Sequence, residues 1–165
     1  MSWMYQPSPQ MERDLLQSFW KALGTWKPDD WQLKLAVFKD SEPIGLQDMW
    51  AKKFATNHTV TTGSWLGLAH QGQGYGAEMR AATLELAFAH LDAIEAYSDY
   101  IDTNEKSAAV SRKLGYQPNG QRAETVDGIA TFKHFLRLTR ENWEHQRQPG
   151  VEVTSLPPCL EFFGL

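Results

Sequence analysis

The fold is decided by the stretch WLGLAHQGQGYGA, residues 65–77, in which an apolar strand end runs into a glycine-rich loop and then into a helix. Gly72, Gly74 and Gly76 alternate with other residues in this loop. Glycine tolerates positive φ and lets an anion approach the backbone closely. Backbone N–H groups converge where a helix begins, and the helix dipole adds partial positive charge there. The stretch therefore predicts a phosphate-binding loop.

Several ligands use a loop of this kind, and the flanking residues separate them. A Walker loop would end in Gly-Lys-Ser/Thr, whereas Gly74 is followed by Tyr75. A dinucleotide fingerprint would need further parallel strands and an acidic residue at a strand end, but Asp92 follows a predicted helix. The pyrophosphate of coenzyme A is the third candidate. A tight turn without any ligand is a fourth interpretation, because a single glycine pattern is a weak signal.

The periodicity on either side of the loop predicts both helices and strands. Residues 77–90 give the strongest helical pattern, with Met79, Ala82, Leu86 and Ala87 on one face. The other predicted elements are a helix that begins at Ser8-Pro9 and ends at Gly24, strands at residues 33–38, 44–50, 60–68 and 93–100, a short helix ending at Gly115, a hairpin of residues 121–126 and 129–139 around Asp127-Gly128, and a helix at residues 139–146. This order predicts an α/β fold of the α+β type, with a mixed, largely antiparallel central sheet flanked by helices.

Composition narrows the class of protein further. The chain has 165 residues, of which 42% are hydrophobic and 22% charged, so it can build one core. The net charge of -4 argues against nucleic acid as a partner, and no apolar stretch approaches the roughly 20 residues that span a membrane. The single Cys159 excludes an internal disulfide and a multi-cysteine metal site, so no metal is expected. Without a signal-peptide pattern at the N-terminus, we expect a cytoplasmic protein.

Two motifs, about 30 residues apart, resemble the GNAT superfamily of acetyltransferases. That superfamily carries Gln/Arg-x-x-Gly-x-Gly/Ala between its fourth strand and third helix, and Gln71, Gly74 and Gly76 match it. It often has an Asn before a short helix that ends in Gly-Phe or Gly-Tyr, and residues 104–107 (NEKS) and 113–116 (KLGY) are similar. The pair of motifs at this separation is more specific than either alone. The resemblance implies the GNAT fold.

Within the superfamily, residues 33–143 resemble the branch that acetylates the N-termini of ribosomal proteins. The words that carry this resemblance are GSWL at residues 63–66, LAF at 86–88, Asn-x-x-Ser at 104–107 and LTRE at 138–141. The chain departs from the family pattern in two ways. The usual first edge strand, rich in Leu and Arg, is missing before the first helix, and Ser111 stands where many members have a Tyr acid.

The resemblance implies an acetyl-CoA-dependent N-acetyltransferase, in which an amine attacks the thioester directly in a ternary complex. The acceptor would be a protein N-terminus or a small-molecule amine. Ser107 would protonate the departing thiolate, Ser111 is the second candidate for this role, and Tyr116 is expected in the core. The residues expected to bind the cofactor are Trp65, Leu66, Gly67, Leu68, Gln71, Gly72, Gln73, Gly74, Tyr75, Gly76, Ala77, Asn104 and Ser107.

The general base is left open by the sequence. Asp48, Asp99 and Glu95 lie on predicted strands that should flank the site, and His70 lies at the edge of the loop. Each could take a proton through water, since a desolvated ammonium needs only a modest base. Each is equally an ordinary surface residue. The alternative functions are therefore a coenzyme A-binding protein without turnover, or a nucleotide-binding module.

The chain divides into a single domain at residues 1–148 and a tail at residues 149–165. Residues 151–156 alternate apolar and polar side chains, which predicts a half-buried strand that covers an exposed sheet edge. The apolar end of the tail, from Leu160 to Leu165, would cover further core. The tail would pack either on its own domain or on a partner subunit, and in the second case the protein would be a homodimer.

Overall fold

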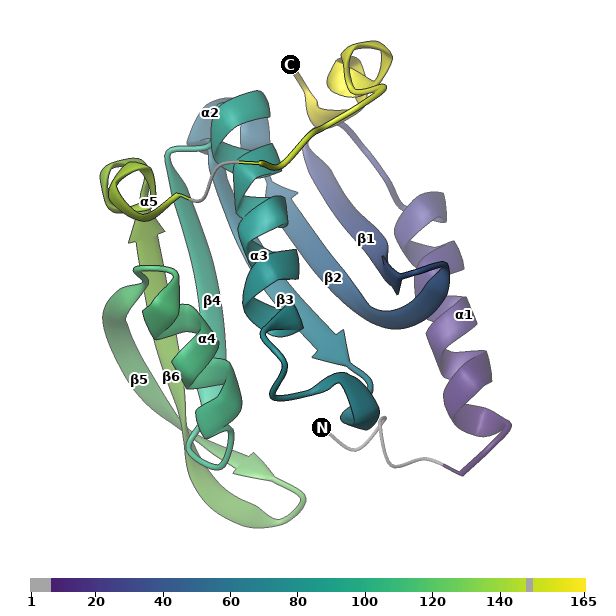
Figure 1. The fold of residues 1–165 in the computed structure, drawn as a ribbon, viewed down its shortest axis with the longest axis vertical. Coiled ribbons are helices and arrows are strands. Elements are labelled where there is room, and N and C mark those ends of the chain that lie inside the picture. Colours follow the sequence, from purple (N-terminus) through teal and green to yellow (C-terminus); the bar gives the residue numbers. More distant parts are fainter. Residues whose placement is uncertain (1–6, 148–149) are drawn as a thin grey trace.

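The computed structural model describes residues 7–147 and 150–165, and its centre is one six-stranded sheet with the strand order β1-β2-β3-β4-β6-β5 (Figure 1). The strands are β1 (Asp30–Lys39), β2 (Glu42–Lys52), β3 (Thr59–Leu66), β4 (Glu95–Ile101), β5 (Gln117–Val126) and β6 (Ile129–Thr139). The α-helices are α1 (Gln10–Gly24), α2 (Phe54–Asn57), α3 (Tyr75–Glu85), α4 (Glu105–Lys113) and α5 (Arg140–Gln146). The pair β3–β4 is parallel and the other pairs are antiparallel, so the predicted mixed sheet is confirmed.

The strand β3 changes partners along its length. Its first residues, Thr59–Thr61, pair with Glu95–Tyr97 of β4. Beyond that point β3 continues beside β2 as far as Leu66, while β4 continues beside β6 as far as Ile101, so that β3 and β4 diverge (Figure 1). We call residues 59–61 the closed end of β3 and residues 62–66 its open end.

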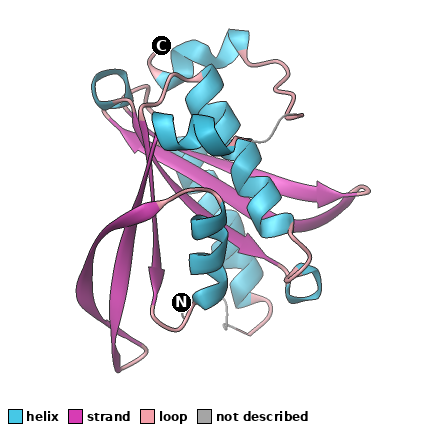
Figure 2. Ribbon diagram, turned by 60° about the vertical axis from the view of Figure 1, so that its left-hand side comes forward, coloured by secondary structure: helices cyan, strands magenta, loops and turns pink. Residues whose placement is uncertain are grey.

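The two faces of the sheet carry different helices (Figures 1 and 2). Helix α3 crosses the face on which the core is built, and the Nζ of Lys34 on the other face lies over the ring of Phe19 in α1. The core contains large side chains that are at most 2% exposed: Trp31, Met49, Phe54, Leu84, Phe88, Leu91 and Leu138. None of the described helices is long and apolar enough to cross a membrane.

The predicted helix at residues 77–90 occurs in two parts. The α-helical part spans Tyr75–Glu85, and the chain then continues as a π-helical turn, Leu86–His90. The buried face also differs from the prediction, because Arg80 and Thr83 lie inside while Ala82 is only half-buried. A smaller correction concerns α1, which begins at Gln10 after its N-cap Pro9 rather than at Ser8-Pro9. The predicted hairpin at Asp127-Gly128 is confirmed, with Val126 opposite Ile129.

The tail does not form the predicted strand. Residues 151–156 make no sheet pairing, and in the described part of the chain β1 and β5 are the two edges of the sheet. Residues 151–154 instead lie over a hollow of about 430 Å³ beside Leu35–Phe38 and α3. Val151 and Val153 therefore alternate with exposed residues because they face the surface of the domain, and not because they pair with an edge strand.

The end of the tail completes an aromatic cluster on its own chain. A 3-10 helix, Pro157–Phe163, places the buried ring of Phe163 edge-on against Trp31 and Trp26, with centroids 5.0 and 5.4 Å apart. The indole Nε1 of Trp26 donates a hydrogen bond to the Phe162 carbonyl, 2.7 Å away. Burial of an aromatic ring of this size outweighs what a few edge pairings of residues 151–156 would contribute.

Candidate functional site

The glycine-rich loop connects the open end of β3 to α3. The chain makes a 3-10 turn at Leu68–His70 and then passes through Gly72 and Gly74, which have φ of 77° and 93°. A Cβ at either glycine would meet no atom within 4 Å. These positions therefore need glycine for their backbone conformation, and the space above them is open.

Five successive backbone N–H groups in the loop are free. Over residues 7–147 and 150–165, no acceptor lies in hydrogen-bond geometry for the N–H groups of residues 72–76. The Gly74 carbonyl instead accepts from Ala77 and Glu78, which begins the hydrogen bonding of α3. Free N–H groups at the start of an 11-residue helix form an anion-binding site, because the helix dipole reinforces them.

Two glutamine side chains of the loop and one lysine of α4 hold the loop in place. The Gln71 amide donates to the Leu66 carbonyl at 3.0 Å, and its oxygen accepts from Lys106 of α4, also at 3.0 Å. The Gln73 amide donates to the Ala69 carbonyl at 2.8 Å. Gln71 thus joins the end of β3 to α4, and Lys106 brings a positive charge beside the loop.

The predicted cofactor residues lie along β3, the loop and the start of two helices. Trp65 and Leu66 are the last residues of β3, but the expected strand does not reach Leu68, which is 86% exposed in the 3-10 turn. The chain turns there through the hydrogen bond from the His70 N–H to the Gly67 carbonyl, which closes the 3-10 turn. The Tyr75 ring faces the Nζ of Lys39 at 5.2 Å, and Ala77 is buried.

The helix α4 brings the two predicted serines into different surroundings. Asn104 is its N-cap, and the Asn104 side-chain oxygen accepts from the Ser107 N–H at 3.1 Å. Ser107 is half-buried. Ser111 is 1% exposed, and its hydroxyl donates to the Ser107 carbonyl at 3.1 Å while accepting from Arg80. The only hydroxyl proton of Ser111 is therefore already in use.

Arg80 belongs to the candidate site, although it was not among the residues predicted from the sequence. Its side chain is buried against the open end of β3, where Nη1 donates to the Ser111 hydroxyl at 2.9 Å and Nη2 to the Ser64 hydroxyl at 2.8 Å. Burial lowers the pKa of the Arg80 guanidinium. Ala77, Arg80, Leu84 and Ala87 are spaced so that they share one face of a helix. This spacing is the pattern in the sequence that could have indicated that Arg80 is buried.

The four candidate bases differ in the charged groups with which they interact. The Asp48 carboxylate is 2.9 Å from the Nζ of Lys34, on the α1 face of the sheet, and its Oδ1 is buried without a partner. Asp99 pairs with Lys133 at 3.2 Å. The hydrogen bond from Arg137 lowers the pKa of Glu95, which makes Glu95 a weaker base. His70 lies 3.9 Å from Glu42 at the rim of the loop.

Asp48 and Asp99 lie on the two strands that flank the open end of β3. Asp48 is directly opposite Gly63 in the β2–β3 register, and the Trp50 ring lies over the Cβ-free face of Gly63. Side chains alternate between faces along a strand, so Asp48, Gly63 and Trp65 share the α1 face, while Thr62 and Ser64 share the α3 face. The open end of β3 thus has acidic groups on one face and hydroxyl groups with Arg80 on the other.

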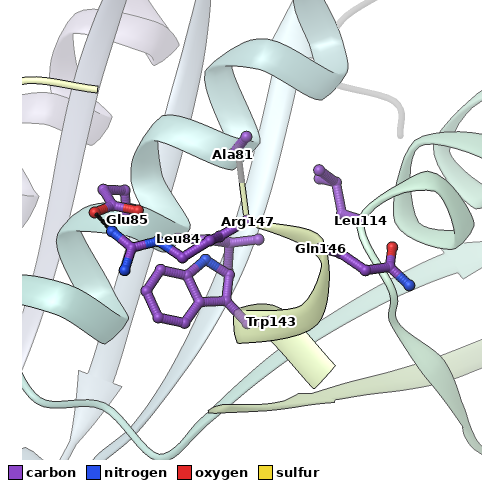
Figure 3. Close-up of a pocket in the computed structure, with 7 residues that line it drawn as sticks. All are labelled: Ala81, Leu84, Glu85, Leu114, Trp143, Gln146 and Arg147. Atoms are coloured by element: carbon purple, nitrogen blue, oxygen red, sulfur yellow. Dashed lines mark hydrogen bonds and ion pairs between the residues drawn. The ribbon is translucent and has the colours of Figure 1, made fainter. Parts of the chain in front are cut away.

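A small hollow between α3 and α5 has a structural role (Figure 3). Its volume is about 10 Å³, which is room for roughly one water molecule. Arg147 pairs with Glu85 and lies over the Trp143 ring, with 4.7 Å between the guanidinium carbon and the ring centroid. These contacts attach α5 to α3. The hollow lies among the residues Ala81, Leu84, Glu85, Leu114, Trp143, Gln146 and Arg147, none of which belongs to the loop.

Comparison with known proteins defines the class. Residues 1–117 match a family model described as an acetyltransferase (GNAT) domain. The chain therefore belongs to the GNAT acetyltransferase family, and it is an acyltransferase by family.

Several solved structures share the fold at low sequence identity. A variant of the spermidine N-acetyltransferase SpeG from Vibrio cholerae superposes with a TM-score of 0.69 and 14% identity, over 82% of this chain and 79% of that one. Mycobacterium smegmatis RimJ in complex with CoA-disulfide gives 0.62 and 20%, over 67% and 54%. A Vibrio cholerae protein described as a ribosomal-protein-serine acetyltransferase gives 0.63 and 17%, over 79% and 74%.

Proposed function

We propose that this protein transfers the acetyl group of acetyl-CoA to an amine in a ternary complex. The observation that carries the proposal is the position of the five free N–H groups of residues 72–76 beside the unpaired open end of β3. The first feature suits a pyrophosphate and the second suits an extended, amide-containing arm. Coenzyme A contains both, and no other ligand weighed for this loop does.

The cofactor site is the sum of these two features. The N–H groups of residues 72–76 would hold the pyrophosphate, with Lys106 adding positive charge nearby. Main-chain groups of residues 62–66 that β4 does not use would bind the arm as if it were a strand. When bound, acetyl-CoA supplies an activated acetyl group as a thioester. A main-chain N–H of the open end of β3 would polarise its carbonyl.

The acceptor would approach on the α1 face, where Asp48 and Asp99 lie on either side of β3. Carboxylates in this position attract a cationic amine and can accept its proton, directly or through water. Asp48 is the stronger candidate for the base because its buried Oδ1 has no partner. The family branch suggested by the sequence favours a protein N-terminus, and a polyamine is the small-molecule alternative.

Ser107 would lie near the sulfur that leaves during the reaction. Its N–H is held by Asn104, so its position at the first turn of α4 is fixed. Ser111 is a poor choice for the same role because its hydroxyl proton is held by the Ser107 carbonyl. In this arrangement Ser111 orients α4 and Arg80 rather than meeting the substrate.

The test is binding and turnover measured on the same sample. We expect calorimetry to show binding of acetyl-CoA, and release of free thiol to be accelerated by an amine from a panel that contains spermidine and a peptide with N-terminal serine. Asp48→Asn should lower kcat by about 10²–10⁴-fold with little change in acetyl-CoA affinity. Binding without turnover of any amine would favour the silent coenzyme A-binding protein, and absence of binding would refute the cofactor site.

A further inference from the structure

Arg80 is a buried cation that no carboxylate of the described residues contacts directly, and the charge of Asp99 in β4 acts on it only from a distance. Arg80 is 3% exposed, and no carboxylate within the described ranges lies within 4.0 Å of its guanidinium nitrogens. Its Nε is also buried without a hydrogen-bond acceptor. A buried charge is costly unless it is paired, and two neutral hydroxyls compensate it only in part. The position is therefore suited to an anion that arrives with a ligand.

The two serines that bind Arg80 differ in whether their hydroxyl protons have an acceptor. Both oxygens accept from Arg80, so each serine can donate only its own proton. Ser111 donates to the Ser107 carbonyl. Ser64 has no acceptor for its proton in the part of the chain that the structure describes, and it is exposed. Ser64 is thus a donor that is backed by a cation and free to bind a ligand.

Ser64 also lies where the reaction would occur. It is three residues past the last β3–β4 pair, Thr61 with Tyr97, and so about 10 Å into the open end of β3. A hydroxyl that accepts a hydrogen bond from a cation becomes a stronger donor, and the effect is larger where the dielectric constant is low. Ser107, in contrast, has no cation bonded to its hydroxyl among the described contacts.

We propose that Ser64 donates a hydrogen bond to the sulfur of coenzyme A, and that Arg80 is the positioning residue that orients Ser64 and favours the anionic form of that sulfur. The inference rests on the proposed function and deepens it. When the amine nitrogen bonds to the acetyl carbon, the carbon–sulfur bond breaks and its electron pair stays on sulfur. The amine proton passes to the base on the α1 face. Ser64 and Arg80 stabilise the thiolate until it leaves and takes a proton from solvent.

The proposal predicts how coenzyme A affinity depends on pH. If the site favours the thiolate, the pKa of the bound thiol is lower than that of the free thiol, and affinity rises with pH between those two values. Desulfo-coenzyme A has no thiol, so its affinity provides the control for every other titrating group. We expect calorimetry of the wild-type protein to give a ratio of coenzyme A to desulfo-coenzyme A affinity that rises about tenfold or more from pH 6 to pH 9.5.

Three variants separate this role from a structural one. Ser64→Ala changes an exposed hydroxyl, so we expect the fold to be kept and most of the pH-dependent rise to be lost. Arg80→Gln removes the charge and should abolish the rise, whereas Arg80→Lys keeps the charge and should restore part of it. Thermal unfolding identifies any variant that fails to fold. If the Arg80 variants do not fold, the result for Ser64→Ala tests the proposal without them.

The possible results distinguish this inference from the proposed function. If neither ligand binds the wild-type protein, the cofactor site itself is wrong, and this inference falls with it. If both ligands bind equally at every pH, only the role of Ser64 and Arg80 is refuted. If Ser64→Ala keeps the full rise, or if Arg80→Gln loses stability but keeps the rise, the two residues are structural.

Discussion

The two ends of β3 differ in what surrounds them. At the closed end, β3 pairs with β4, and the buried side chains nearby are apolar, with Val60, Phe54 and Phe88 each at most 1% exposed. At the open end, β3 has no β4 partner, and the side chains around it are polar: Thr62, Ser64 and Arg80 on one face and Asp48 on the other. The two environments adjoin between Thr61 and Thr62 of the same strand.

This contrast indicates a division of labour within one strand. The closed end contributes apolar burial, which stabilises the fold. The open end keeps main-chain groups unpaired and holds a buried cation that no carboxylate of the described residues contacts, which costs stability and suits a ligand. Substitutions at the closed end should therefore change stability with little effect on cofactor affinity, and substitutions at the open end should do the reverse. Three experiments test this division.

The largest expected effect comes from the aromatic cluster behind the closed end. Phe163→Ala removes a ring that contacts Trp26 and Trp31, and we expect a loss of about 3–5 kcal/mol in the free energy of unfolding. For a chain of this length, that loss corresponds to a fall of about 6–20 °C in Tm. Calorimetry below the new Tm should find unchanged acetyl-CoA affinity.

The neighbouring residue provides the matched control. Phe162 is 53% exposed, so Phe162→Ala should change stability by less than about 0.5 kcal/mol. Equal shifts for the two variants would mean that the tail does not complete the core as described.

An intermediate effect is expected at the loop beside the open end. Gly74 has φ of 93°, and Gly74→Ala should drive the loop away from this conformation and disperse the N–H groups of residues 72–76. We expect acetyl-CoA affinity to fall about tenfold or more, together with a loss of about 1–2 kcal/mol in stability. Calorimetry and thermal unfolding measure the two quantities separately.

Gly120 in β5 is the matched position for this substitution. Its φ is 97°, and a Cβ there would meet no atom within 4 Å, as at Gly74. Gly120→Ala should therefore lose similar stability and keep its acetyl-CoA affinity. If both variants lose affinity equally, the effect of Gly74→Ala is a general one, and the loop is not the binding site.

The smallest effect concerns an ion pair at the closed end. The hydrogen bond from Arg137 lowers the pKa of Glu95, so this carboxylate stabilises the fold above its ordinary pKa. That contribution is lost as pH falls through the lowered pKa. We expect the wild-type protein to lose more stability between pH 7 and pH 3 than Glu95→Gln does, by less than about 1 kcal/mol.

The control for this measurement is Glu105→Gln. Glu105 pairs with Arg112, but both side chains are more than 60% exposed, so the substitution should not change the acid dependence. If Glu95→Gln and the wild-type protein respond identically to acid, the Glu95–Arg137 pair contributes nothing to folding. Acetyl-CoA affinity at pH 7 should be the same in all three proteins.

Local patterns were sufficient to predict most of the fold. Asp127-Gly128 marked a hairpin, and Gly115 marked a helix end, because each needs a backbone conformation that few residues adopt; Asp127 and Gly115 both have positive φ in the structure. Only the strand at residues 151–156 was predicted wrongly, because the alternation of these residues does not reveal whether a sheet edge or a sheet face lies opposite. That distinction depends on where the rest of the chain places the segment.

The candidate site was harder to predict than the fold. The glycine loop is contiguous, so its conformation follows from its own sequence. Arg80, Ser64 and Ser111 come from a helix, a strand and another helix, and nothing local to Arg80 shows that it would be buried among hydroxyls. A long basic side chain on a helix is usually assigned to solvent. Only its place on the face of Ala77, Leu84 and Ala87 indicated otherwise.

The contact between the tail and the region of Trp26 and Trp31 has a consequence for the order of folding. The hydrogen bond from Trp26 to Phe162 spans 136 residues, and the Phe163 ring closes against Trp26 and Trp31 over a similar separation. Closing so long a loop is entropically costly and slow, so local hairpins and helices should form first. Trp26 and Trp31 would then stay accessible to water until the last step. Indole fluorescence should therefore report the docking of the tail as a phase later than the gain of secondary structure.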